Sequence, residues 1–158
     1  KMPEVAYLKL TNKKSGSQIK GGCVEKDNKD MIEVQGFEHT ITVPTHRQTG
    51  AATGETMHGP IVIVKPMDRA SPLLQLALNE HNELEGEVDF YRTRDGKRTH
   101  WYTIKFYDAR LVEVRTYKEL AMEGGDKPDL EQLQFRYRKI SWGHEEQNTE
   151  AEADWLEK

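Results

Sequence analysis

The chain has 158 residues, of which 35% are hydrophobic and 32% charged, and its mean hydropathy is −0.84. This length and polarity fit a single domain with a modest core, and we expect residues 1–158 to form it. The 23 basic and 27 acidic residues give a net charge of −4, which argues against nucleic acid as a partner, and the single cysteine, Cys23, allows neither an internal disulfide nor a cysteine metal site.

The beginning of the chain predicts neither export by a signal peptide nor a membrane anchor. Lys1, in front of Met2, is interpreted as a cloning remnant. No charged-then-apolar leader follows it, and no apolar run approaches the length of a membrane span. We therefore expect a cytoplasmic protein without membrane insertion, which would leave the cell, if at all, without a cleaved signal.

Alternating side chains predict the first strands. A strand is expected at about residues 4–11, followed by a polar loop over 12–30 with a weak strand near Ile19. Met31–Val43 alternates again, and Gln35-Gly36 can shift its phase by one residue. Such a shift at a glycine predicts a β-bulge in one strand.

Residues 44–59, PTHRQTGAATGETMHG, hold four threonines and almost no large apolar side chain. They separate two strong strands. A long segment without structure of its own is usually functional or disordered. Two interpretations stay open, a loose hairpin tip and an arm that pairs with another surface.

The most apolar part of the chain predicts a strand, a helix and a strand. Ile61–Val64 is a continuous β-branched run, expected to form a strand buried on both faces. Ser71 and Pro72 fit the N-cap and the first turn of a helix over about residues 72–81. The apolar face of that helix would hold Leu73, Leu74, Ala77 and Leu78. Strand character returns at Val88, so the helix is expected to cover one open side of a β-structure.

The rest of the chain predicts further strands. Arg94–Lys97 is typical of a hairpin turn. The strands expected after it are 99–107, a second over Leu111–Tyr117 beyond a break at Asp108-Ala109, and a long one from Leu130 to His144. Residues 118–129 predict a loop with a weak helix signal at 118–123, and residues 145–158 an acidic tail that is ordered in part, at Trp155. Seven or eight strands and one helix predict a mainly β protein, a barrel or a sandwich.

No residue pattern that marks an enzyme is found. The histidines lack metal-ligand spacing, and His39 and His100 are interpreted as structural residues of strands. Ser71 lacks the glycine-flanked turn of a serine nucleophile, and the glycines of 44–59 do not form a phosphate-binding loop. The strand carboxylates expected on the solvated face are Glu33, Glu38, Glu87 and Asp89. We therefore expect no catalytic, cofactor-binding or metal-binding residue.

Five stretches occur in one order along the chain: Met2-Pro3 with AYLKL (6–10), VQGFEHTITVPT (34–45), TGETMHGPIVIVKPMDRASPLL (53–74), EVDFYRT (87–93), and LEQLQFRYRKISWGH (130–144) with a terminal Asp154-Trp155. Together they resemble the haemolysin-coregulated protein (Hcp) family, which provides the inner tube of the bacterial type VI secretion system. The SPLL helix start and the YRKISW strand are the most specific of these marks.

The resemblance implies a compact β-barrel of two sheets with one flanking α-helix, and a structural protein rather than an enzyme. It implies homo-hexameric rings that stack into a hollow tube inside a contractile sheath. It also implies spike-tip and baseplate proteins as partners, small effector proteins in the lumen, and secretion through the type VI machine. The acidic residues 145–153 depart from the family's final hairpin, so the end of the last strand stays open.

We expect the 44–59 loop to contact a neighbouring subunit, in the same ring or in the next one. The residues expected at this contact are Thr45, His46, Arg47, Gln48, Thr49, Thr53, Glu55, Thr56 and His58. One alternative is a monomeric carbohydrate-binding β-sandwich with a sugar-stacking surface of Trp101, Tyr102, Trp142 and Trp155. Another is a hydrolase whose site is assembled from distant residues.

Overall fold

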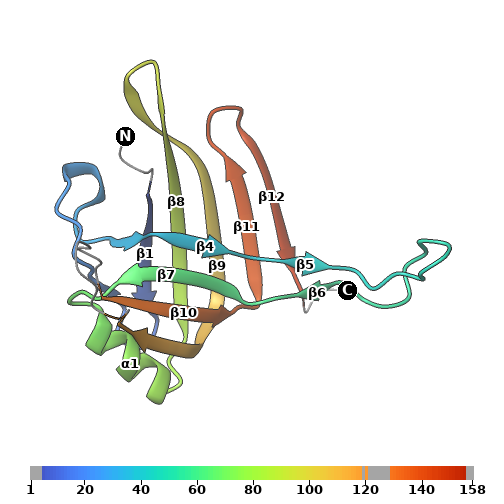
Figure 1. Cartoon of the computed structure of the whole chain (residues 1–158), viewed down its shortest axis with the longest axis horizontal. Coiled ribbons are helices and arrows are strands. Elements are labelled where there is room, and N and C mark those ends of the chain that lie inside the picture. The colour runs from blue at the N-terminus through green and yellow to red at the C-terminus, as the bar shows by residue number, and fades with distance from the viewer. Residues whose placement is uncertain (1–4, 119, 121–128, 156–158) are drawn as a thin grey trace.

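The structure, a computed structural model, describes residues 5–118, 120 and 129–155 (Figure 1). Within them lie twelve strands, the helix α1 (Ser71–Asn79) and a short 3₁₀ helix, η1 (Lys26–Asn28). The strands are β1 (Ala6–Asn12), β2 (Ser17–Ile19), β3 (Ile32–Val34), β4 (Gly36–Glu38), β5 (Ile41–Thr42), β6 (Met57–His58), β7 (Ile61–Pro66), β8 (Leu84–Arg94), β9 (Lys97–Tyr117), β10 (Leu130–Arg136), β11 (Lys139–His144) and β12 (Thr149–Asp154).

Ten of the strands form one bent sheet, and β5 and β6 pair as a second, small sheet. The bent sheet makes two walls of a barrel, which share β9. The first wall has the order β1–β8–β9–β11–β12, with β2 and β3 on the other edge of β1, and the second wall has the order β9–β10–β7–β4. The prediction of a mainly β barrel with one flanking helix is confirmed.

Gln35 marks the point where the chain crosses from the first wall to the second. β3 pairs with β1, whereas β4 pairs with β7. The Gln35 N–H donates to the Val64 carbonyl at 2.8 Å, and this bond joins the two walls at the corner. The prediction of one bulged strand over Met31–Val43 is therefore wrong, because the phase shift at Gln35-Gly36 reflects a change of partner strand.

Both walls turn alternate apolar side chains into one core. Phe106 on the shared strand and Phe135 on the second wall are fully buried, with ring centres 5.2 Å apart. In the Ile61–Val64 run, Ile61 and Ile63 are fully buried, whereas the two valines are only half-buried. This strand has one core face, not the two that its β-branched run predicts.

The helix α1 lies at one end of the barrel (Figure 1). Leu74 and Ala77 are buried, and Leu78 is half-buried against the core. Leu73, predicted on the same face, is 48% exposed, so the buried stripe is narrower than expected. Within the described residues, no helix is long and apolar enough to cross a membrane.

Ser71 belongs to a buried polar cluster and does not cap the helix as predicted. Its Oγ accepts from the Asp68 N–H at 3.0 Å and donates to Glu131 Oε1 at 2.7 Å. The same glutamate pairs with Lys65, and the two residues are 1% and 0% exposed. Asp68 Oδ1 accepts from the N–H of Ala70, the residue just before the helix, at 2.9 Å. The cluster ties this start to β7 and β10.

Two predicted strand boundaries differ in the structure. β9 continues through the expected break at Asp108-Ala109, where Asp108 has a φ of 50° and the pairing of β8 with β9 shifts register. The expected strand over 130–144 is instead divided into β10 and β11 by Tyr137 and Arg138. Both irregularities lie at the corner where β9 changes its partner from β11 in the first wall to β10 in the second.

The acidic end of the chain is a strand. β12 pairs with β11 through a turn that includes Asn148 at a φ of 54°, and Trp155 Nε1 then donates to the Tyr137 carbonyl. The partly ordered tail is thus a hairpin as far as Asp154. The weak helix signal falls mostly on residues 119 and 121–128, and the end of the tail on 156–158, all outside the described residues.

Candidate assembly site

A two-stranded arm, residues 40–59, projects from the barrel (Figure 1). Its strands β5 and β6 pair Ile41 with His58, and a bridge further out joins Thr45 to Ala52. Every residue from Thr45 to Met57 is exposed. The predicted loop is therefore a hairpin that leaves the surface of its own subunit.

The tip of the arm is held by its own hydrogen bonds. The His46 N–H donates to the Ala51 carbonyl at 2.7 Å, and the Gly50 N–H donates to the His46 carbonyl at 2.9 Å. His46 Nδ1 accepts from the N–H groups of Gln48 and Thr49 at 3.3 and 3.4 Å. Gly50 has a φ of 74°, a conformation that glycine adopts without strain. The tip thus has a defined shape, although no apolar core supports it.

The predicted contact residues lie on this arm, and one of them lies at its base. The exposed ones are Thr45, His46, Arg47, Gln48, Thr49, Thr53, Glu55 and Thr56. His58 is only half-exposed and bonds to the barrel. A two-stranded hairpin alone is marginally stable in water, so an arm of this kind gains stability from a second surface. The contact with a neighbouring subunit stays a prediction.

Tyr137, between β10 and β11, anchors the base of the arm. Its hydroxyl lies 2.6 Å from His58 Nδ1 and 2.9 Å from His39 Nε2. Arg136 adds a third tie, because its Nη1 donates to the His58 carbonyl at 3.0 Å. His39 lies between β4 and β5, not inside a strand as predicted, so the anchor holds the arm where it leaves the barrel and where it returns.

Burial changes the protonation of this anchor. It raises the pKa of the Tyr137 hydroxyl to about 12, against a smaller opposite effect of the Arg136 charge. It lowers the pKa of His39, and the nearby His58 lowers it further. At neutral pH the anchor therefore consists of a neutral tyrosine and a neutral His39.

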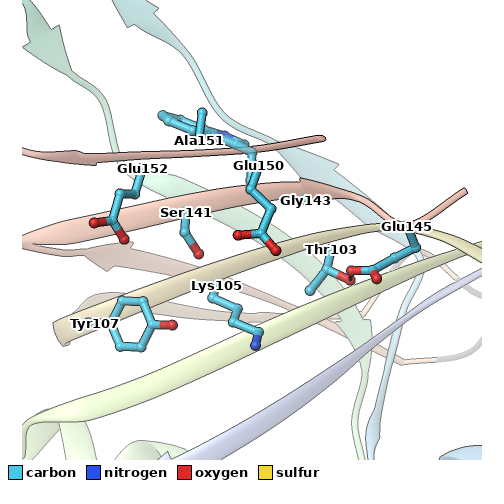
Figure 2. A pocket seen from close by; sticks show the side chains of 10 residues that line it. Thr103, Lys105, Tyr107, Ser141, Gly143, Glu145, Glu150, Ala151 and Glu152 are labelled. Atoms are coloured by element: carbon cyan, nitrogen blue, oxygen red, sulfur yellow. Dashed lines mark hydrogen bonds between the residues drawn. The ribbon is translucent and has the colours of Figure 1, made fainter. Parts of the chain in front are cut away.

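A groove of about 370 Å³ lies on the outer face of the first wall, over the paired strands β9, β11 and β12 (Figure 2). Its lining includes Thr103, Lys105, Tyr107, Ser141, Gly143, Glu145, Glu150 and Glu152. In the described part of the chain, no three His, Cys, Asp or Glu side chains are placed to hold a metal ion. The groove is an open, acidic, solvated surface.

Asp89 is buried, only 8% exposed, although it was predicted to be solvated. Its Oδ1 lies 3.5 Å from His100 Nε2, which bonds to Thr103 Oγ1 at 2.7 Å, and this hydroxyl donates to Glu145 Oε1 at 2.9 Å. Burial raises the pKa of Asp89 to about 7, and the charges of Glu87 and Glu145 add to the effect. Strand alternation predicts the correct face for Asp89 but not the crowding on that face.

The four aromatic residues of the carbohydrate-binding alternative do not form one platform. Tyr102 and Trp142 pack against the core. The Trp101 ring lies 4.7 Å from the Arg92 guanidinium, and Trp155 is tied through its indole N–H to the β10–β11 junction. A flat stacking surface for a sugar is therefore not formed by these residues.

Comparisons with known proteins give one consistent result. A family model described as "Type VI secretion system effector, Hcp" matches residues 7–144. The "Major exported protein" of Pseudomonas aeruginosa is 36% identical over 166 residues, which cover 98% of this chain and 96% of that protein.

Solved structures match over almost the whole chain. The Hcp1 protein from the E. coli EAEC 042 pathovar, solved as a mutant, has a TM-score of 0.86 at 30% identity, covering 97% of this chain and 99% of that one. The secreted protein Hcp3 from Pseudomonas aeruginosa has a TM-score of 0.79 at 33% identity, with the same coverage of 97% and 99%. The crystal structure of a further Hcp protein has a TM-score of 0.91 at 28% identity, covering 99% of this chain and 100% of that one.

Proposed function

This chain belongs to the Hcp family of secreted type VI tube proteins, and we propose that six copies form a ring and that rings stack into a hollow tube. The protein is a structural component and not an enzyme. A ring closes when one surface of a subunit meets a different surface of the next, and the same kind of contact allows rings to stack. The arm supports the proposal most directly, because it is a shaped protrusion that its own subunit leaves uncovered.

The chemistry of the arm suits a contact with another copy. Its threonine hydroxyls, together with Arg47 and Glu55, offer hydrogen-bonding and charged groups along the exposed part of the hairpin. Exposed strand edges pair readily with a second protein surface. Every residue from Thr45 to Met57 is exposed in the single subunit, so packing against a neighbour, in the same ring or the next, would bury this part of the arm and stabilise it.

The polar first wall suits a surface that faces water or cargo. The Glu-rich groove of Figure 2 presents charged and hydroxyl groups and no apolar patch that would need a permanent cover. We propose that the tube carries small effector proteins in its lumen and that it contacts a contractile sheath, spike-tip and baseplate proteins. Synthesis in the cytoplasm and release by the type VI machine complete the proposed route.

Deletion of residues 48–55 tests this function. The deletion removes the tip and leaves the base hydrogen bonds at Tyr137 in place, so the barrel is expected to fold. Sedimentation should then show monomers in place of rings, and secretion should be lost. The control variant Lys13→Ser/Lys14→Ser, in an exposed turn, should assemble and be secreted normally. Rings and secretion that survive the deletion would refute the role of the arm.

A further inference from the structure

Three side chains hold both strands of the arm at one point of the barrel. His39 precedes β5, His58 lies in β6, and the Tyr137 hydroxyl sits between them at 2.9 and 2.6 Å. We infer that this cluster is a proton-sensitive hinge, which fixes the direction of the arm at neutral pH and releases it in mildly acidic solution. The inference rests on the proposed function, in which the arm joins subunits.

One hydroxyl between two imidazoles is satisfied in only some protonation states. With both rings neutral, the hydroxyl donates to one ring nitrogen and accepts from the N–H of the other. A first proton is accommodated, because the charged ring donates to the hydroxyl and the hydroxyl donates to the neutral ring. A second proton leaves the hydroxyl hydrogen without an acceptor in the cluster, and it places two positive rings on one oxygen atom.

The surroundings oppose double protonation. Arg136 of β10 donates to the His58 carbonyl at 3.0 Å and brings another positive charge to the cluster. Burial disfavours the charged form of His39. The other charged groups on the elements that meet here are Glu38, Glu55, Arg138 and Asp154, of which the last two pair with each other at 3.4 Å.

The lowered pKa of His39 gives the sign of the pH effect. A closed hinge binds fewer protons at His39 than an open arm does, because the imidazole of an open arm keeps the ordinary pKa of about 6.5. The closed state is therefore fully favoured above that pH and loses stability as the pH falls below it. Tyr137 stays protonated throughout, because burial raises its pKa to about 12. A tube in a neutral cytoplasm would hold, and a tube delivered into an acidic compartment would come apart.

The test replaces both histidines by amides that keep a polar atom in the same place without titrating. Gln in the variant His39→Gln reaches the Nε2 position, and Asn in the variant His58→Asn reaches the Nδ1 position. Sedimentation should show wild-type rings dissociating with a midpoint at about pH 6, whereas rings of the double variant persist at about pH 5. A matched control, His81→Gln/His144→Asn, removes two histidines outside the arm and should dissociate as the wild type does.

Two results would overturn the hinge. One is a wild-type ring that is equally stable at neutral and acidic pH, and the other is a double variant that dissociates at the wild-type pH. Hydrogen exchange of the Gly59 amide, which donates to the Thr40 carbonyl at the base of the arm, gives a reading that needs no ring. After correction for intrinsic rates, its exchange should speed up by about tenfold in acid in the wild type and stay constant in the double variant. If no rings form at any pH, the proposed function fails. The exchange rate of the Gly59 amide then tests the hinge without the rings.

Discussion

Lys65 and Glu131 are two opposite charges in the interior of the barrel. Their side chains are 0% and 1% exposed, and the Lys65 ammonium also bonds to the Pro66 carbonyl at 2.8 Å and to Asp68 Oδ1 at 3.0 Å. Removing water from two charges is costly, and only this complete set of partners offsets the cost. The pair therefore specifies how β7, β10 and the start of α1 meet.

Replacing one partner of this pair should strongly destabilise the folded protein. The variant Lys65→Met leaves the Glu131 carboxylate buried without its cation, and urea unfolding should show a loss of about 3–5 kcal/mol. The double variant Lys65→Met/Glu131→Leu should recover part of it. The exposed pair of Lys118 and Asp129 provides the control, because Lys118→Met should cost less than about 1 kcal/mol. Equal losses for Lys65→Met and Lys118→Met would contradict the argument.

Asp89 makes stability depend on pH. Its folded-state pKa of about 7 lies above the ordinary 3.8, because of burial, the charges of Glu87 and Glu145, and a weaker opposing effect of Lys105. The folded protein then binds more protons than the unfolded chain between these values, so this residue costs stability as the pH rises from about 4 to about 7.

The neutral variant Asp89→Asn should remove that dependence. At about pH 8 it should unfold at a higher urea concentration than the wild type, because it carries no buried charge. At about pH 5, where the wild-type Asp89 is itself protonated, the two midpoints should approach each other. A midpoint difference that is the same at both pH values would contradict this account, because it would show that the protonation of Asp89 does not change between them.

At the scale of elements, α1 has one side that packs and one side that does not. Leu74 is fully buried at the end of the barrel, whereas Leu76, in the same helix, is 53% exposed. The variant Leu74→Ala should lower the free energy of unfolding by about 2–5 kcal/mol, and Leu76→Ala by less than about 0.5 kcal/mol. Thermal unfolding followed by circular dichroism measures both. Similar losses for the two variants would mean that the helix is rotated on the barrel.

Local patterns predicted most of these elements, because side-chain alternation and turn residues act over a few positions. They placed the helix start within one residue but gave Ser71 the wrong role, since its partner Glu131 lies 60 positions away. The change of partner strand at Gln35 was likewise predicted as a bulge, because the sequence of one strand does not show which strands pair with it. The polar, threonine-rich composition of residues 44–59 correctly predicted the exposed part of the arm. Its anchor at Tyr137 was missed, because it lies 98 and 79 positions from the two histidines that it holds.

At the scale of the whole molecule, the low hydropathy of the chain follows from its shape. The barrel has one core, and the arm and the outer faces of the walls carry mostly polar or charged side chains, with Val43 and Met57 exposed on the arm and Val112 on β9. A subunit of a hollow ring needs solvated surfaces on the outside and along the channel, together with one protrusion that reaches the next subunit. The fold and the composition therefore support the same assembly.

The native mass and shape of the purified protein test this assembly most directly. Sedimentation combined with negative-stain electron microscopy should show particles of six times the 18.3 kDa subunit mass, with a central channel. Increasing protein concentration should add stacked rings without changing the six-fold particle. A single 18.3 kDa species that persists at high concentration and neutral pH would contradict the account.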